Sequence, residues 1–235
     1  MINNVAIMQP YFMPYIGYFQ LINSVDKFVI YDNIQYTKKG FINRNRILFN
    51  GSDRGFTIPI KKNSDYLNVM EREISNTWLK DRDKLIKIIK QSYNKAPYFD
   101  ICFPLIVECI KHNDLNLFNF IHNSVKVLCN YLNINTQIIK SSDIPIDHSK
   151  KSQDKVITIC KALKATKYIN AIGGQELYSP PPFKKEGIEL AFIKTNYIEY
   201  KQFNNKFEPW LSIIDLLMFN SDKELKNHLN NYSLI

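Results

Sequence analysis

The chain has 235 residues, and 45% of them are hydrophobic. This is enough to bury one core, so we expect a single α/β domain over residues 1–235. No apolar run approaches the roughly 18 residues that a membrane-spanning helix needs, and residues 1–4 lack the basic region of a signal peptide. These features predict a cytoplasmic protein without a membrane span.

The formal net charge of +9 indicates an anionic partner. The basic residues form no RRM, helix-turn-helix or zinc pattern, so we do not expect nucleic-acid binding. The four cysteines are widely spaced, without a CxxC or Cys/His pair, and this predicts buried thiols and no metal. P-loop, Gly-x-Ser-x-Gly and complete dinucleotide motifs are also missing, which argues against several large enzyme classes.

The beginning of the chain reads as strand, loop, helix and strand. Residues 5–8 form a buried strand that ends at Gln9 and Pro10, residues 17–25 have apolar positions at helical spacing, and residues 28–31 form a second strand. Residues 32–55 are polar and basic and are expected to be a loop. Residues 56–60 then read as a strand ended by its own proline.

A helical middle section is expected over about residues 77–133. Its apolar spacing predicts helices over residues 77–94, 104–112 and 115–132. Strands and helices then alternate again, which is typical of a mostly parallel, Rossmann-like sheet flanked by helices. The expected elements are a strand at 136–139, a helix at 151–163, strands at 168–171 and 188–193, and helices at 211–219 and 222–230. Gly173, Gly174 and the prolines of residues 180–182 are expected to break the chain before the strand at 188–193.

The loop of residues 9–18 is the first candidate site. It follows the first strand and leads into a helix N-terminus, where open α/β sheets bind their ligands. Its polar and aromatic residues could contact a sugar or stack on a base, whereas the alternative is a loop that only caps the core. The candidate substrate-binding residues here are Gln9, Tyr11, Tyr15, Gly17 and Tyr18.

The same layout resembles the first unit of the nucleotidylyltransferase and class I synthetase (HUP) superfamily, which carries a His-x-Gly-His motif in this loop. Residues 15–18 read Tyr-Ile-Gly-Tyr, so both histidines are absent. The resemblance implies a fold and not an activity.

The second candidate segment is residues 32–46. Asp32 follows the second strand and is a candidate catalytic base, while Gln35 and Lys38 are candidate substrate-binding residues. Asn43 and Asn45 alternate with Arg44 and Arg46, so in an extended chain each pair would face its own side. The arginines are candidates for a phosphate or carboxylate clamp, and a surface loop with ordinary charges is the alternative.

Two further groups complete the candidate site. Gly174, Gln175 and Tyr178 follow a predicted strand and could bind a ligand, although a plain turn is the favoured interpretation of this segment. His148 lies in a predicted loop and is the second candidate base.

Several ordered motifs together resemble the WbqC-like family of bacterial proteins, essentially from end to end. A departure follows Trp78, where relatives often carry a His and this chain has residues Asp81, Arg82 and Asp83. The motifs are Gln9-Pro10 with Pro14, Gly17-Tyr18-Phe19, Tyr31-Asp32 with Gln35, Asn43-Arg44-Asn45-Arg46, Tyr93 before Pro97-Tyr98-Phe99, Gln202, and Ser212 with Asp215.

The resemblance implies a role in O-antigen (lipopolysaccharide), capsule or related glycan biosynthesis. We expect modification of a nucleotide-linked amino sugar, most simply N-acyl transfer to its amine from acyl-CoA or a similar donor. The alternatives are ATP-dependent ligation of a carboxylic or amino acid, and non-catalytic binding of a sugar nucleotide. In this interpretation Arg44 and Arg46 hold the diphosphate, Gln9, Gln35 and Gln175 contact hydroxyls, and Asp32 or His148 is the base. Whether the chain forms a homo-oligomer is left open.

Overall fold

The computed structural model describes residues 2–235. Its central sheet contains the strands β1 (Asn4–Met8), β2 (Lys27–Ile30), β5 (Gln137–Lys140), β6 (Lys167–Ala171), β7 (Glu189–Thr195) and β8 (Tyr232–Leu234). They lie in the order β5-β2-β1-β6-β7-β8. All pairs are parallel except β7 with β8, which confirms the expected mostly parallel α/β sheet.

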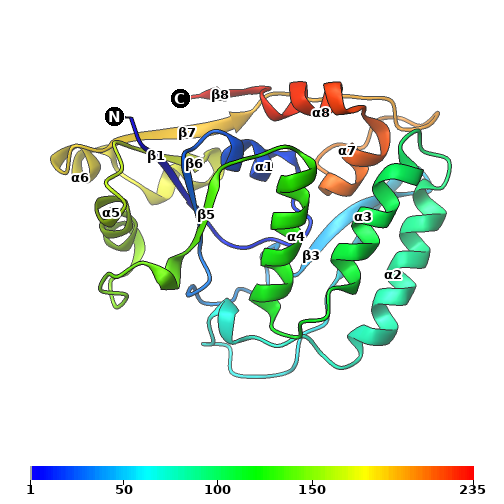
Figure 1. Ribbon diagram of the computed structural model, residues 1–235, viewed down its shortest axis with the longest axis horizontal. Helices are drawn as coiled ribbons and strands as arrows, with labels where there is room; N and C mark the ends of the chain where they lie inside the picture. The colour runs from blue at the N-terminus through cyan, green and yellow to red at the C-terminus, as the bar shows by residue number, and fades with distance from the viewer. Residues whose placement is uncertain (1) are drawn as a thin grey trace.

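Helices cover both faces of this sheet (Figure 1). The helices α2, α3 and α4 lie side by side at one end of the molecule, and α5 and α6 lie at the other. The helices are α1 (Ile16–Asn23), α2 (Trp78–Tyr93), α3 (Phe99–Lys111), α4 (Leu117–Tyr131), α5 (Ser152–Ala162), α6 (Pro180–Lys185), α7 (Ile213–Phe219) and α8 (Asp222–Leu229), with short 3-10 turns η1 (Val69–Glu71), η2 (Ser141–Asp143) and η3 (Ile172–Leu177).

The apolar strands supply two separate cores. On β1, Val5 and Ile7 belong to one buried cluster, which includes Phe183 of α6, whereas Ala6 belongs to the other, which includes Phe120 of α4. Successive side chains of a strand point to opposite faces, so a strand that is apolar at every position is buried on both. The runs of apolar residues in the sequence are explained by this arrangement.

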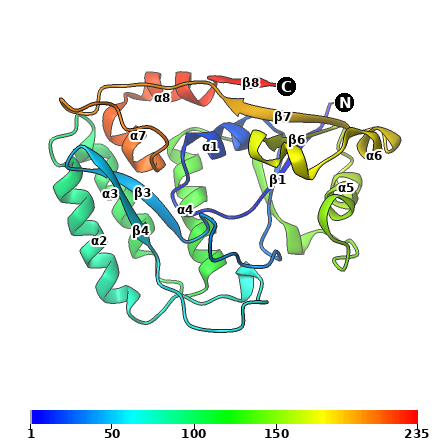
Figure 2. The same cartoon turned by 180° about the vertical axis from the view of Figure 1, so that it is seen from behind.

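A second, two-stranded sheet lies outside the central one. It consists of β3 (Arg44–Phe49) and β4 (Ser52–Thr57), which pair antiparallel and lie on the same side of the molecule as α2 and α3 (Figure 2). The expectation of a loop over residues 32–55 was therefore wrong at its end. The polar residues of β3 are compatible with a strand because this hairpin does not have two buried faces.

Two proline predictions also need correction. The helix expected from residue 104 begins at Phe99 and contains Pro104 in its interior. The prolines of residues 180–182, expected to break the chain, instead begin α6. Proline suits the first turn of a helix because the missing N–H has no intrahelical partner there.

Residues 2–235 contain neither a candidate membrane span nor a candidate metal cluster. None of the helices there combines the length and the apolar character needed to cross a membrane. Within the same residues, no group of three or more His, Cys, Asp or Glu is arranged to hold a metal ion.

Candidate functional site

A cavity of about 1150 Å³ opens at the carboxyl ends of β1, β2 and β6. The strand order places β1 between β2 and β6, because the chain runs outward from β1 through β2 to β5 and then returns to β6 on the other side of β1. Open α/β sheets bind their ligands at this switch point. The volume is slightly above the roughly 300–1,000 Å³ that is usual for small-molecule sites.

The loop of residues 9–18 forms one wall of the cavity. Gln9, Tyr11, Tyr15, Gly17 and Tyr18 all line it. The hydroxyl of Tyr18 donates to the backbone oxygen of Gln9 at 3.0 Å. Burial raises the pKa of Tyr18 well above its usual value, so this phenol stays protonated and keeps donating.

Segments distant in the sequence hold this wall in place. The amide of Asn45 on β3 donates to the backbone oxygens of Met13 at 2.6 Å and Phe12 at 3.3 Å. The hydroxyl of Ser212 donates to the Met13 oxygen at 2.7 Å, and the N–H of Ile213 donates to Pro14 at 2.8 Å. The loop is therefore bound to the protein on its side away from the cavity.

The asparagines and arginines of residues 43–46 alternate in exposure, with Arg44 and Arg46 half-buried. Asn43 and Asn45 are buried, and Asn43 is fully engaged because its amide donates to Ile58 and its oxygen accepts from Tyr36. Arg46 lines the cavity, although its guanidinium is paired with Asp53 at 3.0 Å. Asn45 also lines the cavity, but its amide is directed to the loop wall.

Arg44 and Lys38, by contrast, are not among the cavity-lining residues. The guanidinium of Arg44 donates to the backbone oxygens of Gly40 and Lys39, and it lies over the ring of Phe41. Arg44 therefore acts within its own loop. The expected clamp of two arginines is not formed, because the hydrogen bonds to Gly40 and Lys39 hold the guanidinium of Arg44 within residues 39–41.

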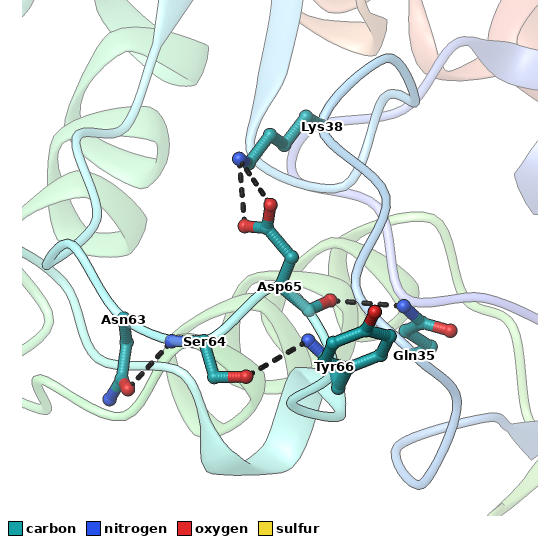
Figure 3. A network of polar contacts seen from close by, with 6 residues as sticks. All are labelled: Gln35, Lys38, Asn63, Ser64, Asp65 and Tyr66. Atoms are coloured by element: carbon teal, nitrogen blue, oxygen red, sulfur yellow. Dashed lines mark hydrogen bonds and ion pairs between the residues drawn. The ribbon is translucent and has the colours of Figure 1, made fainter.

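Lys38 belongs to an exposed polar network beside the cavity (Figure 3). Its ammonium pairs with Asp65 at 2.7 Å, and this hydrogen bond lowers the pKa of Asp65 below its usual value. The amide of Gln35 donates to the backbone oxygen of Asp65 at 3.0 Å, and Gln35 itself lines the cavity. Exposed pairs of this kind contribute little to stability.

Asp32 is buried and does not line the cavity. Its carboxylate accepts hydrogen bonds from the backbone N–H of Ser142 at 2.9 Å and from the Ser142 hydroxyl at 2.5 Å. Its neighbours Tyr31 and Asn33 line the cavity instead. Asp32 thus connects the end of β2 to η2 by hydrogen bonds. Because it does not reach the cavity, we do not retain it as a candidate catalytic base.

His148 lines the cavity, but both of its ring nitrogens are engaged. The side-chain oxygen of Asn33 accepts from Ser141 at 2.8 Å, so the Asn33 amide is directed toward His148 Nδ1 at 3.0 Å and donates to it. Nε2 must then carry the proton that it donates to Ile144 at 3.0 Å. In this arrangement the imidazole has no free lone pair to accept a proton from a ligand.

Only part of the third candidate segment, residues 174–178, lies at the cavity. Gly174 and Tyr178 line the cavity, whereas Gln175 is exposed and does not. A Cβ atom on Gly174 would lie 2.4 Å from the side-chain nitrogen of Asn170. Gly174 is therefore required for the close approach of η3 to the end of β6.

Several lining residues were missed from the sequence, among them Asn33, Lys155 and Asn170. Asn33 and Asn170 follow or end predicted strands, so the rule that selected Asp32 could have found them. Lys155 lies on α5 and is only 5% exposed. Burial lowers the pKa of Lys155, while the charge of Asp32 opposes this shift.

The charge of the cavity lining has one sign. Arg46, Lys150, Lys151 and Lys155 line the cavity, and none of the described residues that line it is an Asp or Glu. Three large apolar side chains at the lining are strongly exposed, namely Phe41 at 48%, Trp210 at 56% and Leu177 at 69%. The cavity thus combines cationic groups with apolar surface, which suits an anionic ligand that also carries a ring or chain.

The fold and site define an α/β protein with a cationic ligand cavity at the carboxyl edge of a parallel sheet. Residues 9–227 match the model of the WbqC-like protein family, and the chain belongs to that family, as the sequence motifs predicted. It is 32% identical over 232 residues to the uncharacterized protein Rv1507c of Mycobacterium tuberculosis, covering 96% of each chain. No solved structure matches, so the nucleotidylyltransferase-like (HUP) arrangement has no structural neighbour to confirm it.

Proposed function

We propose that this protein is a transferase that binds a nucleotide-linked amino sugar in the cavity and transfers an acyl group to the sugar amine. The observation that carries this proposal is the lining of the cavity, with four cationic side chains and no carboxylate among its described residues. A diphosphate is the anionic part of a nucleotide sugar, and such a lining would attract it. The glycan role implied by the family resemblance supports the same substrate class.

The strand order supports a nucleotide as the other part of the ligand. The five parallel strands follow the order 3-2-1-4-5 when they are counted along the chain. Doubly wound sheets with this order bind nucleotides beside the first strand. In this chain that position is the cavity, where Tyr15 and the exposed Trp210 offer aromatic surface to a base.

The reaction is an acyl transfer from a thioester donor such as acyl-CoA. The amine nitrogen forms a bond to the acyl carbon, the C–S bond breaks, and the proton lost by the nitrogen is taken up by the departing thiolate. The protein would contribute mainly by holding the amine and the donor in contact. Gln9 and Asn170 end neighbouring strands and are the side chains that we assign to the sugar hydroxyls.

Thermal-shift measurements with a panel of nucleoside diphosphate sugars, with and without acyl-CoA, test the proposal. We expect a saturable rise in melting temperature with an amino-sugar nucleotide, followed by a product whose mass is increased by one acyl group. If no nucleotide sugar binds, or if a bound one is never acylated by any thioester donor, the proposal fails. Consumption of ATP with a carboxylic acid would instead establish the ligase alternative, which the same strand order also suits.

A matched pair of variants connects the binding to this cavity. Gln9→Leu removes a polar group from the cavity lining, whereas Gln91→Leu makes the same change on the exposed surface of α2. We expect Gln9→Leu to weaken binding of the nucleotide sugar at least tenfold and Gln91→Leu to leave it unchanged. Equal affinities for the two variants would place the ligand elsewhere.

A further inference from the structure

The N-terminal turn of α5 forms part of the cavity wall. Lys150, Lys151, Ser152 and Gln153 line the cavity there, at the beginning of the helix. The residue before the helix, Lys151, makes no side-chain capping hydrogen bond. The first backbone N–H groups of a helix have no intrahelical acceptor, so this turn presents free donors as well as two lysine side chains.

A buried cation lies one turn further along the same helix. Lys155 is 5% exposed and lines the cavity. Its ammonium lies 3.5 Å from the side-chain oxygen of Asn33 and 5.0 Å from the centre of the Tyr31 ring. Among residues 2–235, no Asp or Glu forms an ion pair with Lys155.

Burial of the Lys155 ammonium has a free-energy cost that a bound anion would reduce. An ammonium carries three donors, and here only one long hydrogen bond is made within the described residues. The carboxylate of Asp32, whose charge acts on Lys155, accepts its hydrogen bonds from Ser142 instead. Burying a charge with one long hydrogen bond and an aromatic ring as its partners is unfavourable, and an anion in the cavity would reduce that cost.

We propose that Lys155 and the N-terminal turn of α5 form the subsite for the phosphate groups of the ligand. This inference rests on the proposed function and deepens it, because it fixes which wall of the cavity the diphosphate contacts. Phosphate oxygens accept hydrogen bonds from ammonium groups and from the free N–H groups of a helix N-terminus. Arg44 and the ion-paired Arg46, which the sequence suggested for this role, are then not the main phosphate contacts.

The subsite also sets the direction of the ligand. With its phosphates against α5, the uncharged base or sugar extends toward the loop of residues 9–18. Tyr15 and Trp210 lie on that side, with their ring centres 6.0 Å apart. The phosphates would thus contact the cationic wall at α5, and the base or sugar would contact the aromatic wall at Tyr15 and Trp210.

Calorimetric titration with inorganic pyrophosphate tests the subsite without any nucleotide. We expect wild type to bind pyrophosphate, Lys155→Met to bind it at least tenfold more weakly, and Lys155→Arg to retain most of the affinity. The matched control is Lys126→Met, which removes the same charge from the exposed surface of α4 and should change the affinity less than twofold. Melting curves of each variant show whether it is folded.

A second variant avoids the buried position. Lys150 and Lys151 are exposed, so the double variant Lys150→Met with Lys151→Met should fold normally and weaken pyrophosphate binding at least threefold. The subsite is overturned if wild type does not bind pyrophosphate, or if Lys155→Met and the double variant both bind it as tightly as wild type.

The outcome also separates this inference from the proposed function. Pyrophosphate binding that depends on Lys155, together with no binding of any nucleotide sugar, keeps the subsite and rejects the transferase. Binding of a nucleotide sugar that is equally tight in wild type and Lys155→Met rejects the subsite and keeps the transferase.

Discussion

The carboxylate of Asp215 on α7 accepts a hydrogen bond of 2.9 Å from the hydroxyl of Tyr93 at the end of α2. The same carboxylate accepts from Tyr200 at 2.7 Å and from Gln202 at 2.6 Å. Tyr93 in turn accepts from the backbone N–H of Leu48 on β3 at 2.8 Å. One buried acid therefore joins α2, α7, β3 and the segment before α7.

Replacement of this acid should destabilise the fold. Asp215 is fully buried, so Asp215→Ala would leave three donors without an acceptor. We expect the free energy of unfolding in urea to fall by about 3 kcal/mol. The control is Asp83→Ala, at an exposed position of α2, which should change it by less than about 0.5 kcal/mol. Similar losses in both variants would contradict this role.

Asp215 should also make stability depend on pH. Burial raises its pKa from 3.8 to about 6, although its three hydrogen bonds lower it in part. Between about pH 4 and 6 the folded state thus holds more protons on this group than the unfolded state, so its contribution falls as the pH rises. Relative to Asp215→Asn, wild type should lose up to about 3 kcal/mol from pH 4 to pH 7.

The comparison must be made between the two proteins at each pH. Burial lowers the pKa of His122 to about 4, so His122 makes stability rise over the same range, in the opposite direction. Both proteins contain His122, and its contribution cancels in the difference between their urea midpoints. A difference that is constant with pH would show that Asp215 does not titrate in this range.

The two neighbouring glycines of η3 should respond differently to alanine. A Cβ atom on Gly174 would meet the Asn170 amide at 2.4 Å, whereas a Cβ atom on Gly173 would meet nothing within 4 Å. We expect Gly174→Ala to cost about 1–3 kcal/mol of stability and to weaken ligand binding, because it displaces Asn170. Gly173→Ala should be close to neutral in both measurements. Equal melting temperatures would refute the close approach.

Trp210 should contribute to ligand affinity and not to stability. It is 56% exposed at the cavity, and stacking of a base on an aromatic ring is worth about 1–3 kcal/mol by alanine substitution. Trp210→Ala should therefore weaken binding of the nucleotide sugar by that amount in a calorimetric titration. Tyr66→Ala, at a position that is 85% exposed and outside the cavity lining, should have no effect. Unchanged affinity in both variants would exclude stacking on Trp210.

Most of the sheet could be predicted because its strands are buried on both faces. Runs such as residues 5–8 are apolar at every position, and this pattern alone indicates a buried strand, which the structure shows at β1. The β3–β4 hairpin could not be predicted in the same way, because β3 begins with the polar Arg44, Asn45 and Arg46. The three residues of β8 form a strand only through pairing with β7, which leaves no local signal.

The strand ends that the sequence indicated lie at the edge where the cavity opens, but the role of each residue there depends on its contacts. In the turn after β2, Tyr31 and Asn33 line the cavity, whereas Asp32 accepts hydrogen bonds from Ser142. Lys155 lies in a helix where a lysine normally indicates a solvated surface. Only the packing of α5 beside β2 buries it, and that packing depends on residues more than 100 positions away, as the contact with Asn33 illustrates.

The fastening of residues 12–14 by Ser212 and Ile213 has a consequence for the order of events during synthesis. Ser212 and Ile213 leave the ribosome about 200 residues after the loop that they hold. Contacts that close so long a stretch of chain carry a larger loop-closure entropy and form later than local ones. The nascent chain can pair β1 with β2 early, yet this wall of the cavity gains all its anchors only after residues 212 and 213 have been made.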